Sequence, residues 1–524
     1  MKWTHPALPT LALLLPACLP GAHAQQPEPS GAIQTLRVTS NIVVLDVVVT
    51  DAQGNVVPGL KKDDFTILQD NKPQPIRSFD PWEEHPLASA PAAAPKVDRF
   101  GQPDWGDTPL TIFVLDDLNT PFDEKSYSAF TLKKYLQAQP AQLKTPSMLL
   151  IVNETGLHSL AAYTQDRDVL IRALDKRPAS FPDQLAKGND IDLLTESFAV
   201  LRQIALSSEG VRAHKNLVWM GRGFPTVDPS ELDAPGNITL QNALKDTVTL
   251  LTKVRITLYK VDPITSNARA AATDVATSID MGGGMGNRAS VEPPSEDPLK
   301  GDLSFNQFAV QTGGHYFYGR NDLDQQIAGS LERGSEFYTL TYRPQQAPDA
   351  DAYRAIRIQM RDPSLKAVTR QGFYSESAPK PEPTVKEMGF DLKAAATGSM
   401  KYSGVGLQIV AVTSSRTADR VTVNFAVEDK TLTWSPVEAG GESAKILTLL
   451  VAEDAEHRIQ SSTAATLALA VKDARGIAKG VLNTHAQVDI NAKTRFVRLL
   501  VRDSNGRIGS VDVDPASWSG AAPK

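Results

Sequence analysis

Histidine and carboxylate side chains and one glycine-rich segment are the features of this sequence that could serve catalysis or binding, and none forms a recognised catalytic pattern. The cluster Gly282–Gly286 lacks the Lys-Ser/Thr pair that completes a phosphate-binding loop. No Gly-x-Ser-x-Gly nucleophile motif occurs, and nothing locates a pair of carboxylates for acid–base catalysis. The histidines after residue 24 are scattered and form no zinc-binding His-Glu-x-x-His pair: His85, His158, His214, His315, His457 and His485. We therefore expect a protein that is not an enzyme.

Apolar runs in the middle of the chain alternate with segments of helical spacing. The runs Leu110–Leu115, Leu217–Met220 and Ile256–Val261 are typical of strands buried on both faces of a sheet. Helical patterns fall between and around them, and the alternation predicts a doubly wound, mostly parallel α/β sheet over residues 108–334. Ligands bind such sheets at the carboxyl ends of the strands, so the loops after Leu115, Met220 and Val261 form the predicted binding edge. The glycine-rich segment 265–304 is expected to be a mobile loop over that edge.

Segments with the alternating pattern of β-strands flank this α/β domain on both sides. Residues 34–82 predict one part of a β-sandwich, with strands near Ile42–Thr50, Phe65–Leu68 and Ile76–Phe79. A sheet this small needs a second layer, which the strands predicted in residues 335–376 would supply. Residues 387–515 are all-β in pattern, and an immunoglobulin-like C-terminal sandwich fits them best.

The N-terminus has the regions of a secretory signal peptide over residues 1–24. Lys2 precedes an apolar run, and Ala22-His23-Ala24 supplies small residues for cleavage before Gln25. An alternative is a lipid anchor at Cys18, the only cysteine, although Pro16 fits a lipidation motif poorly. No later segment predicts a transmembrane helix. A secreted or periplasmic location is expected, and a net charge of −6 makes nucleic acid an unexpected partner.

Several of these segments resemble a known family. Thr111–Asp116 resembles the first strand and metal-loop aspartate of a von Willebrand factor A domain. Val47–Gly54, Leu60–Phe65 and Thr312–Phe317 resemble a bacterial family abundant in Acidobacteria, the von Willebrand factor A-related domain proteins. The similarity covers roughly residues 36–374. It implies an extracytoplasmic protein ligand, held at a metal-dependent adhesion site (MIDAS) by a divalent cation with oxygen ligands.

The sequence departs from the family's metal-site pattern of Asp-x-Ser-x-Ser, a threonine on a second loop and an aspartate on a third. In the first loop Leu118 replaces a serine, while Thr120 can stand for the other. The second loop falls near Asp190 and lacks the threonine. At the third loop Gly221-Arg222-Gly223 places a positive charge where a ligand is expected, and this charge opposes a cation.

Two interpretations of the first loop follow. In the favoured one, Asp116 and Thr120 cap or brace the following helix, and no cofactor is bound. In the other, Mg²⁺ binds through Asp116, Asp117, Asn119 and Thr120 with the help of water molecules, and Asp116 and Thr120 are the metal-ligand candidates that match the family's pattern. We predict a degenerate site with weak or absent magnesium binding. The candidate residues of the binding edge are Asp116, Asp117, Asn119, Thr120, Asp190 and Arg222.

Three functions remain open at this stage. The leading hypothesis is a secreted or periplasmic protein-binding module of adhesion type, with a ligand of unknown identity. The alternative is a structural component of the envelope or matrix that has no ligand site. An enzyme acting on envelope polymers is the least favoured of the three.

Overall fold

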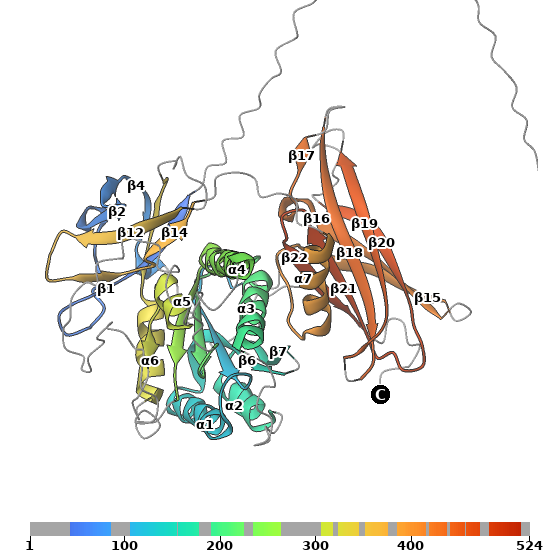
Figure 1. Cartoon of the computed structure of the whole chain (residues 1–524), viewed down its shortest axis with the longest axis horizontal. Helices are drawn as coiled ribbons and strands as arrows, with labels where there is room; N and C mark the ends of the chain where they lie inside the picture. Colours follow the sequence, from blue (N-terminus) through green and yellow to red (C-terminus); the bar gives the residue numbers. More distant parts are fainter. Residues whose placement is uncertain are drawn as a thin grey trace, which may run out of the picture. The chain divides into compact units, whose positions relative to one another are not determined.

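The three apolar runs of the sequence form neighbouring strands of one central sheet. The computed structural model describes residues 42–84, 105–154, 156–177, 190–224, 234–263, 305–317, 323–344, 352–375, 385–415, 419–436, 441–455, 457–471 and 481–514. Six strands form this sheet in the order β10-β9-β8-β5-β6-β7. Figure 1 shows the sheet among the helices of the α/β domain. All neighbours are parallel except β6 and β7. The strands are β5 (Leu110–Asp116), β6 (Gln142–Asn153), β7 (Gly156–Asp166), β8 (Lys215–Met220), β9 (Ile256–Val261) and β10 (Tyr316–Phe317).

Helices cover both faces of this sheet, so successive residues of β5 enter different cores. Phe113 and Leu115 pack with residues of three helices, α1 (Phe122–Ala138), α2 (Arg167–Asp175) and α6 (Leu323–Ser335). Ile112 and Val114 pack with residues of the other three, α3 (Asp190–Ser207), α4 (Ala234–Lys253) and α5 (Phe305–Gln311). Burial on both faces accounts for the absence of exposed positions in β5, β8 and β9, in which every residue is buried. The prediction of a mostly parallel α/β sheet is confirmed.

A β-sandwich is assembled from chain segments on both sides of the α/β domain. Its first sheet has the order β13-β1-β11-β4, and its second has the order β14-β12-β2-β3. Phe65, Phe79 and Tyr338 meet in its core, with ring centroids 5.2–5.8 Å apart. The strands are β1 (Val43–Thr50), β2 (Phe65–Gln69), β3 (Lys72–Gln74), β4 (Ile76–Asp80), β11 (Tyr338–Tyr342), β12 (Tyr353–Met360), β13 (Lys366–Val368) and β14 (Gly372–Tyr374).

The C-terminal region begins with a helix, which corrects the expectation of strands from Glu387 onward. α7 spans Val385–Thr397 and buries Leu392, Ala395 and Ala396. Their spacing of three and four residues is that of one helix face, and alanine has the highest helix propensity. Antiparallel strands follow in two sheets, and their immunoglobulin-like topology stays a prediction. The strands are β15 (Leu407–Ser415), β16 (Arg420–Glu428), β17 (Ser435–Pro436), β18 (Glu442–Glu453), β19 (Ile459–Val471), β20 (Val481–Asp489), β21 (Phe496–Asp503) and β22 (Ile508–Val513).

Some sequence predictions fall on residues outside the described ranges. These are the signal peptide, the lipid anchor at Cys18, the loop at residues 188–189 and the segment 265–304. Within the described ranges, no helix combines the length and apolarity needed to cross a membrane.

Candidate functional site

The carboxyl ends of the three buried strands lie side by side, as the sequence predicts. Leu115 of β5 is in register with Met220 of β8, and Met220 is in register with Val261 of β9. The loop after β5 carries Asp116 through Thr120, and the loop after β8 carries Gly221 through Gly223. The predicted binding edge therefore brings together residues about a hundred positions apart in the sequence.

Asp116 is the centre of the hydrogen bonding at this edge. Its Oδ1 accepts hydrogen bonds from the backbone N–H groups of Leu118 (3.2 Å) and Asn119 (2.9 Å). Its Oδ2 accepts from the Trp219 indole N–H (3.1 Å) and the Gly223 backbone N–H (2.8 Å). Burial raises the pKa of Asp116, while these four hydrogen bonds oppose the shift. The carboxylate thus ties its own loop to the end of β8.

Thr120 and Gly221 hold the two loops in close contact. The Thr120 Oγ1 accepts a hydrogen bond from the backbone N–H of Arg222 at 3.0 Å. Gly221 has a φ of 150°, and a Cβ there would lie 2.5 Å from both the Asp116 Cβ and the Thr120 Oγ1. The glycine at this position is therefore required by the close approach of the loops.

Arg222 forms an ion pair with Glu124, a residue that no sequence motif singled out. The guanidinium donates to the two oxygens of the Glu124 carboxylate at 2.7 and 2.5 Å. The hydrogen bonds to Glu124 raise the pKa of Arg222. Glu124 lies in the first turn of α1, where a carboxylate is also favoured by the helix dipole. The only available signal was its place one turn after Thr120.

The remaining predicted residues of this edge are Asn119, Asp117 and Asp190, of which the first two are hydrogen-bonded to α3 and β6. The Asn119 amide donates to the Ser197 hydroxyl of α3 at 2.9 Å, and its Oδ1 is buried without a hydrogen-bond partner among the described residues. The Asp117 backbone N–H donates to the Val152 carbonyl at 2.8 Å. Asp190 begins α3, but its side chain lies outside the description.

The first loop braces the fold rather than capping a helix. The N-cap residue of α1 is Pro121, which makes no side-chain cap, so neither Asp116 nor Thr120 caps this helix. That part of the expectation was wrong because the Asp116 Oδ2 and the Thr120 Oγ1 accept from the loop after β8, and the Asp116 Oδ1 accepts from its own loop.

The donor set at this edge does not fit a magnesium site. A carboxylate offers about four lone-pair sites, and protein N–H groups occupy four around Asp116. The Thr120 oxygen is likewise engaged by an N–H group. Among the described residues, no group of three or more His, Cys, Asp or Glu side chains could hold a metal ion. The predicted magnesium affinity itself stays a prediction.

Two side chains at this edge are exposed and differ from the buried interior. Phe122 opens α1 and is 40% exposed, although aromatic residues are usually buried. The Arg222 side chain is also 40% exposed, because Glu124 covers only part of the guanidinium. We call Phe122 and Arg222 the rim.

Comparisons with known proteins give weak matches. No protein-family model and no curated protein matches this chain. The crystal structure of the SpRpn10 VWA domain is 15% identical, covers 29% of this chain and 74% of its own, and has a TM-score of 0.20. Manganese-loaded TRAP from Plasmodium vivax is 9% identical, with coverages of 52% and 96% and a TM-score of 0.25. Proximal thread matrix protein 1 from the mussel byssus is 8% identical, with coverages of 29% and 37% and a TM-score of 0.19. Since these scores are low, we base the function on the geometry of the edge.

Proposed function

We propose that this protein is a non-enzymatic, extracytoplasmic protein-binding module of von Willebrand factor A type with a degenerate MIDAS. In this proposal the partner contacts the rim, Phe122 and Arg222, directly and without a bridging cation. The rim lies beside the carboxyl ends of β5 and β8. This is the edge at which parallel α/β sheets present their ligand-binding loops.

The observation that carries the proposal is the hydrogen bonding of Asp116. A cation could bind its carboxylate only by displacing N–H groups of Trp219 and Gly223 or of its own loop. The Leu118, Trp219 and Gly223 donors make buried hydrogen bonds, so losing their acceptor would cost about 1–3 kcal/mol each. The edge is therefore better suited to contact through exposed side chains. Arginine and aromatic residues are the types most enriched among the energetically important residues of interfaces.

Affinity capture with rim variants tests this proposal. Immobilised wild-type protein, Phe122→Ala and Arg222→Ala are incubated with an extracytoplasmic extract, in magnesium or in EDTA. Phe130→Ala is the matched control, since Phe130 is 64% exposed and lies on the same helix. We expect wild type and Phe130→Ala to retain one specific protein equally in both buffers, and both rim variants to retain at least about tenfold less. Circular dichroism checks that the variants are folded.

Two other results of the capture experiment would contradict the proposal. Capture that is lost in EDTA would show that a cation mediates binding and would contradict the degenerate site. Capture that persists in both rim variants would place the binding surface elsewhere.

A structural component without a ligand site is the second candidate, because the same hydrogen bonds of Asp116 also suit a loop that only supports the fold. This candidate predicts no specific partner in the capture experiment. It also predicts self-association that light scattering detects and that the rim variants leave unchanged.

A further inference from the structure

A small cavity lies at the amino end of β9, away from the rim. It is lined from the sandwich by residues of β1 and of the β13–β14 connection, and from the α/β domain by the end of α4, the start of β9 and the residue after α5. The polar residues of its lining are Asp46, Thr252, Arg255, Thr257, Thr312, Thr369 and Arg370. Three of the four threonine hydroxyls, those of Thr252, Thr257 and Thr312, already donate to backbone carbonyls.

Among the described residues, Arg370 in this lining has no anion within ion-pair distance, although the Asp46 carboxylate is near enough to attract it electrostatically. Its Nε is buried and makes no hydrogen bond, and the guanidinium forms no ion pair with any residue that the structure describes. The Thr369 hydroxyl beside it is also buried and without a partner. Burial lowers the pKa of Arg370, as expected for a cation removed from water. The buried part of this guanidinium has no hydrogen-bond acceptor, so a bound anion would stabilise it.

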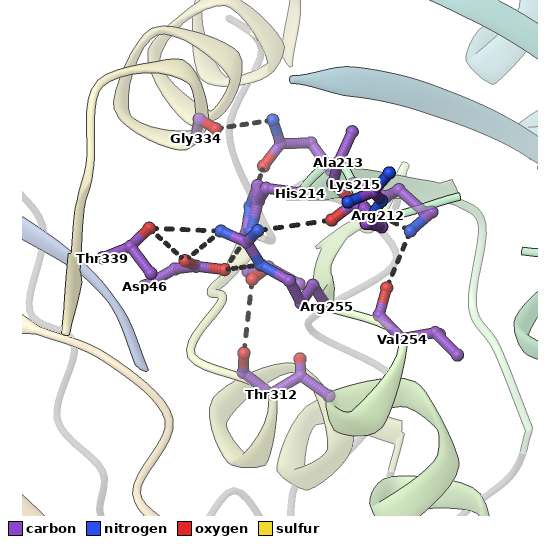
Figure 2. A network of polar contacts seen from close by, with 12 residues as sticks. Asp46, Arg212, Ala213, His214, Lys215, Val254, Arg255, Thr312, Gly334 and Thr339 are labelled. Atoms are coloured by element: carbon purple, nitrogen blue, oxygen red, sulfur yellow. Dashed lines mark hydrogen bonds and ion pairs between the residues drawn. The ribbon is translucent and has the colours of Figure 1, made fainter. Parts of the chain in front are cut away.

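The carboxylate in the lining is already committed to other groups. Arg255 donates to the two oxygens of Asp46 at 2.6 and 3.1 Å. The His214 Nδ1 lies 2.8 Å from the Asp46 Oδ2, and the Thr339 hydroxyl donates to the Oδ1 at 3.0 Å (Figure 2). The cavity thus contains two guanidinium groups and one carboxylate, which leaves it with an excess of positive charge.

Close backbone packing fixes the position of Arg370. Gly313 has a φ of 88°, and a Cβ there would lie 2.8 Å from the Arg370 backbone nitrogen. A Cβ on Gly314 would lie 1.9 Å from the Leu258 carbonyl oxygen. The Thr312 hydroxyl accepts a hydrogen bond from the Leu258 N–H at 2.9 Å. The Thr-Gly-Gly sequence therefore holds the loop carrying Arg370 against β9.

We propose that this cavity is a binding site for a small oxyanion, held by the Arg370 guanidinium and the Thr369 hydroxyl. A planar guanidinium donates paired hydrogen bonds to phosphate, sulfate or carboxylate oxygens, and a neighbouring hydroxyl adds a third donor. The cavity is small, so the ligand is an inorganic ion or a single carboxylate group. The site is independent of the rim and of the protein partner proposed above.

Titration of the full chain with simple anions tests the site. Phosphate, sulfate and acetate are added separately at constant ionic strength in chloride, and binding is followed by calorimetry and by Tm. We expect saturable binding of at least one anion, with a rise in Tm above the chloride control. Binding of phosphate and sulfate alone identifies a tetrahedral oxyanion, whereas binding of acetate identifies a carboxylate.

Variants separate the site from general salt effects. Arg370→Gln should weaken binding at least about tenfold, and Thr369→Val should weaken it about threefold. The matched control is Arg361→Gln. The Arg361 side chain is 66% exposed and lies outside the lining, so this variant should bind as wild type does. Arg370→Met should be at least as stable as wild type without anions, because it removes a buried charge that forms no ion pair with the described residues, and it should gain nothing from phosphate. Equal responses of wild type and both Arg370 variants, or no response beyond chloride, would overturn the proposal.

Discussion

At the residue scale, two buried aspartates show how partners decide the role of a carboxylate. Asp116 accepts hydrogen bonds only from neutral N–H groups and joins two loops. Asp46 is bound by the Arg255 guanidinium and by His214 (Figure 2). Burial by itself raises the pKa of Asp46, but the charges and hydrogen bonds of Arg255 and His214 outweigh it and hold this pKa well below its usual range.

The low pKa of Asp46 predicts a specific acid sensitivity. A carboxyl group whose pKa is lower in the folded state stabilises the fold above its unfolded pKa of about 3.9, and this contribution declines as the pH falls toward the folded value. Below about pH 4, wild type should lose about 1.4 kcal/mol of stability per pH unit more than Asp46→Asn. Urea midpoints between about pH 5 and about pH 2.5 measure this difference. Equal pH dependence of stability in wild type and Asp46→Asn would contradict this prediction. The control is Asp489→Asn, which changes an exposed ion pair and should show the pH dependence of wild type.

At the element scale, the loops after β5 and β8 approach each other so closely that position 221 has no room for a side chain. Gly221→Ala would place a methyl group 2.5 Å from the Asp116 Cβ, in a backbone conformation that side chains rarely adopt. We expect a loss of about 2–4 kcal/mol in the free energy of unfolding, from overpacking and backbone strain together. Urea denaturation followed by tryptophan fluorescence measures it, since Trp219 lies at the same edge.

A second glycine provides the control for this prediction. Gly329 lies within α6, and a Cβ there would meet nothing within 4 Å. Gly329→Ala should therefore leave stability unchanged or raise it by up to about 1 kcal/mol. If both substitutions had the same small effect, the packing at Gly221 would be looser than the structure shows.

At the scale of the whole molecule, the α/β domain is inserted into a sandwich that neither flanking segment completes alone. β11 lies between β1 and β4, and β12 pairs with β2. Deleting residues 42–84 should therefore remove hydrogen-exchange protection from the amides of β11 and β12, because these strands lose their neighbours. The amides of β5 serve as the internal control and should stay protected. Protection of β11 in the truncated chain would show that it folds without β1 and β4.

The sequence by itself determined the elements of the central domain and the edge where its loops meet. Runs such as Leu110–Leu115 and Ile256–Val261 have the length and apolarity of buried strands, and their alternation with helical segments predicts a parallel sheet. The order of strands and helices then places the loops after β5 and β8 together. α7 was missed, because its short apolar face lies between a proline-rich segment and strongly alternating strands.

Only the tertiary structure decided what the polar residues do. Asp116 is bound by Trp219 and Gly223, Arg222 by Glu124, and Arg370 faces a cavity without a partner. Periodicity in a sequence reports local burial, whereas a hydrogen bond depends on where two distant side chains finish after the sheets have packed. For this reason the strands could be predicted from the residues alone, and the partners of each charge could not.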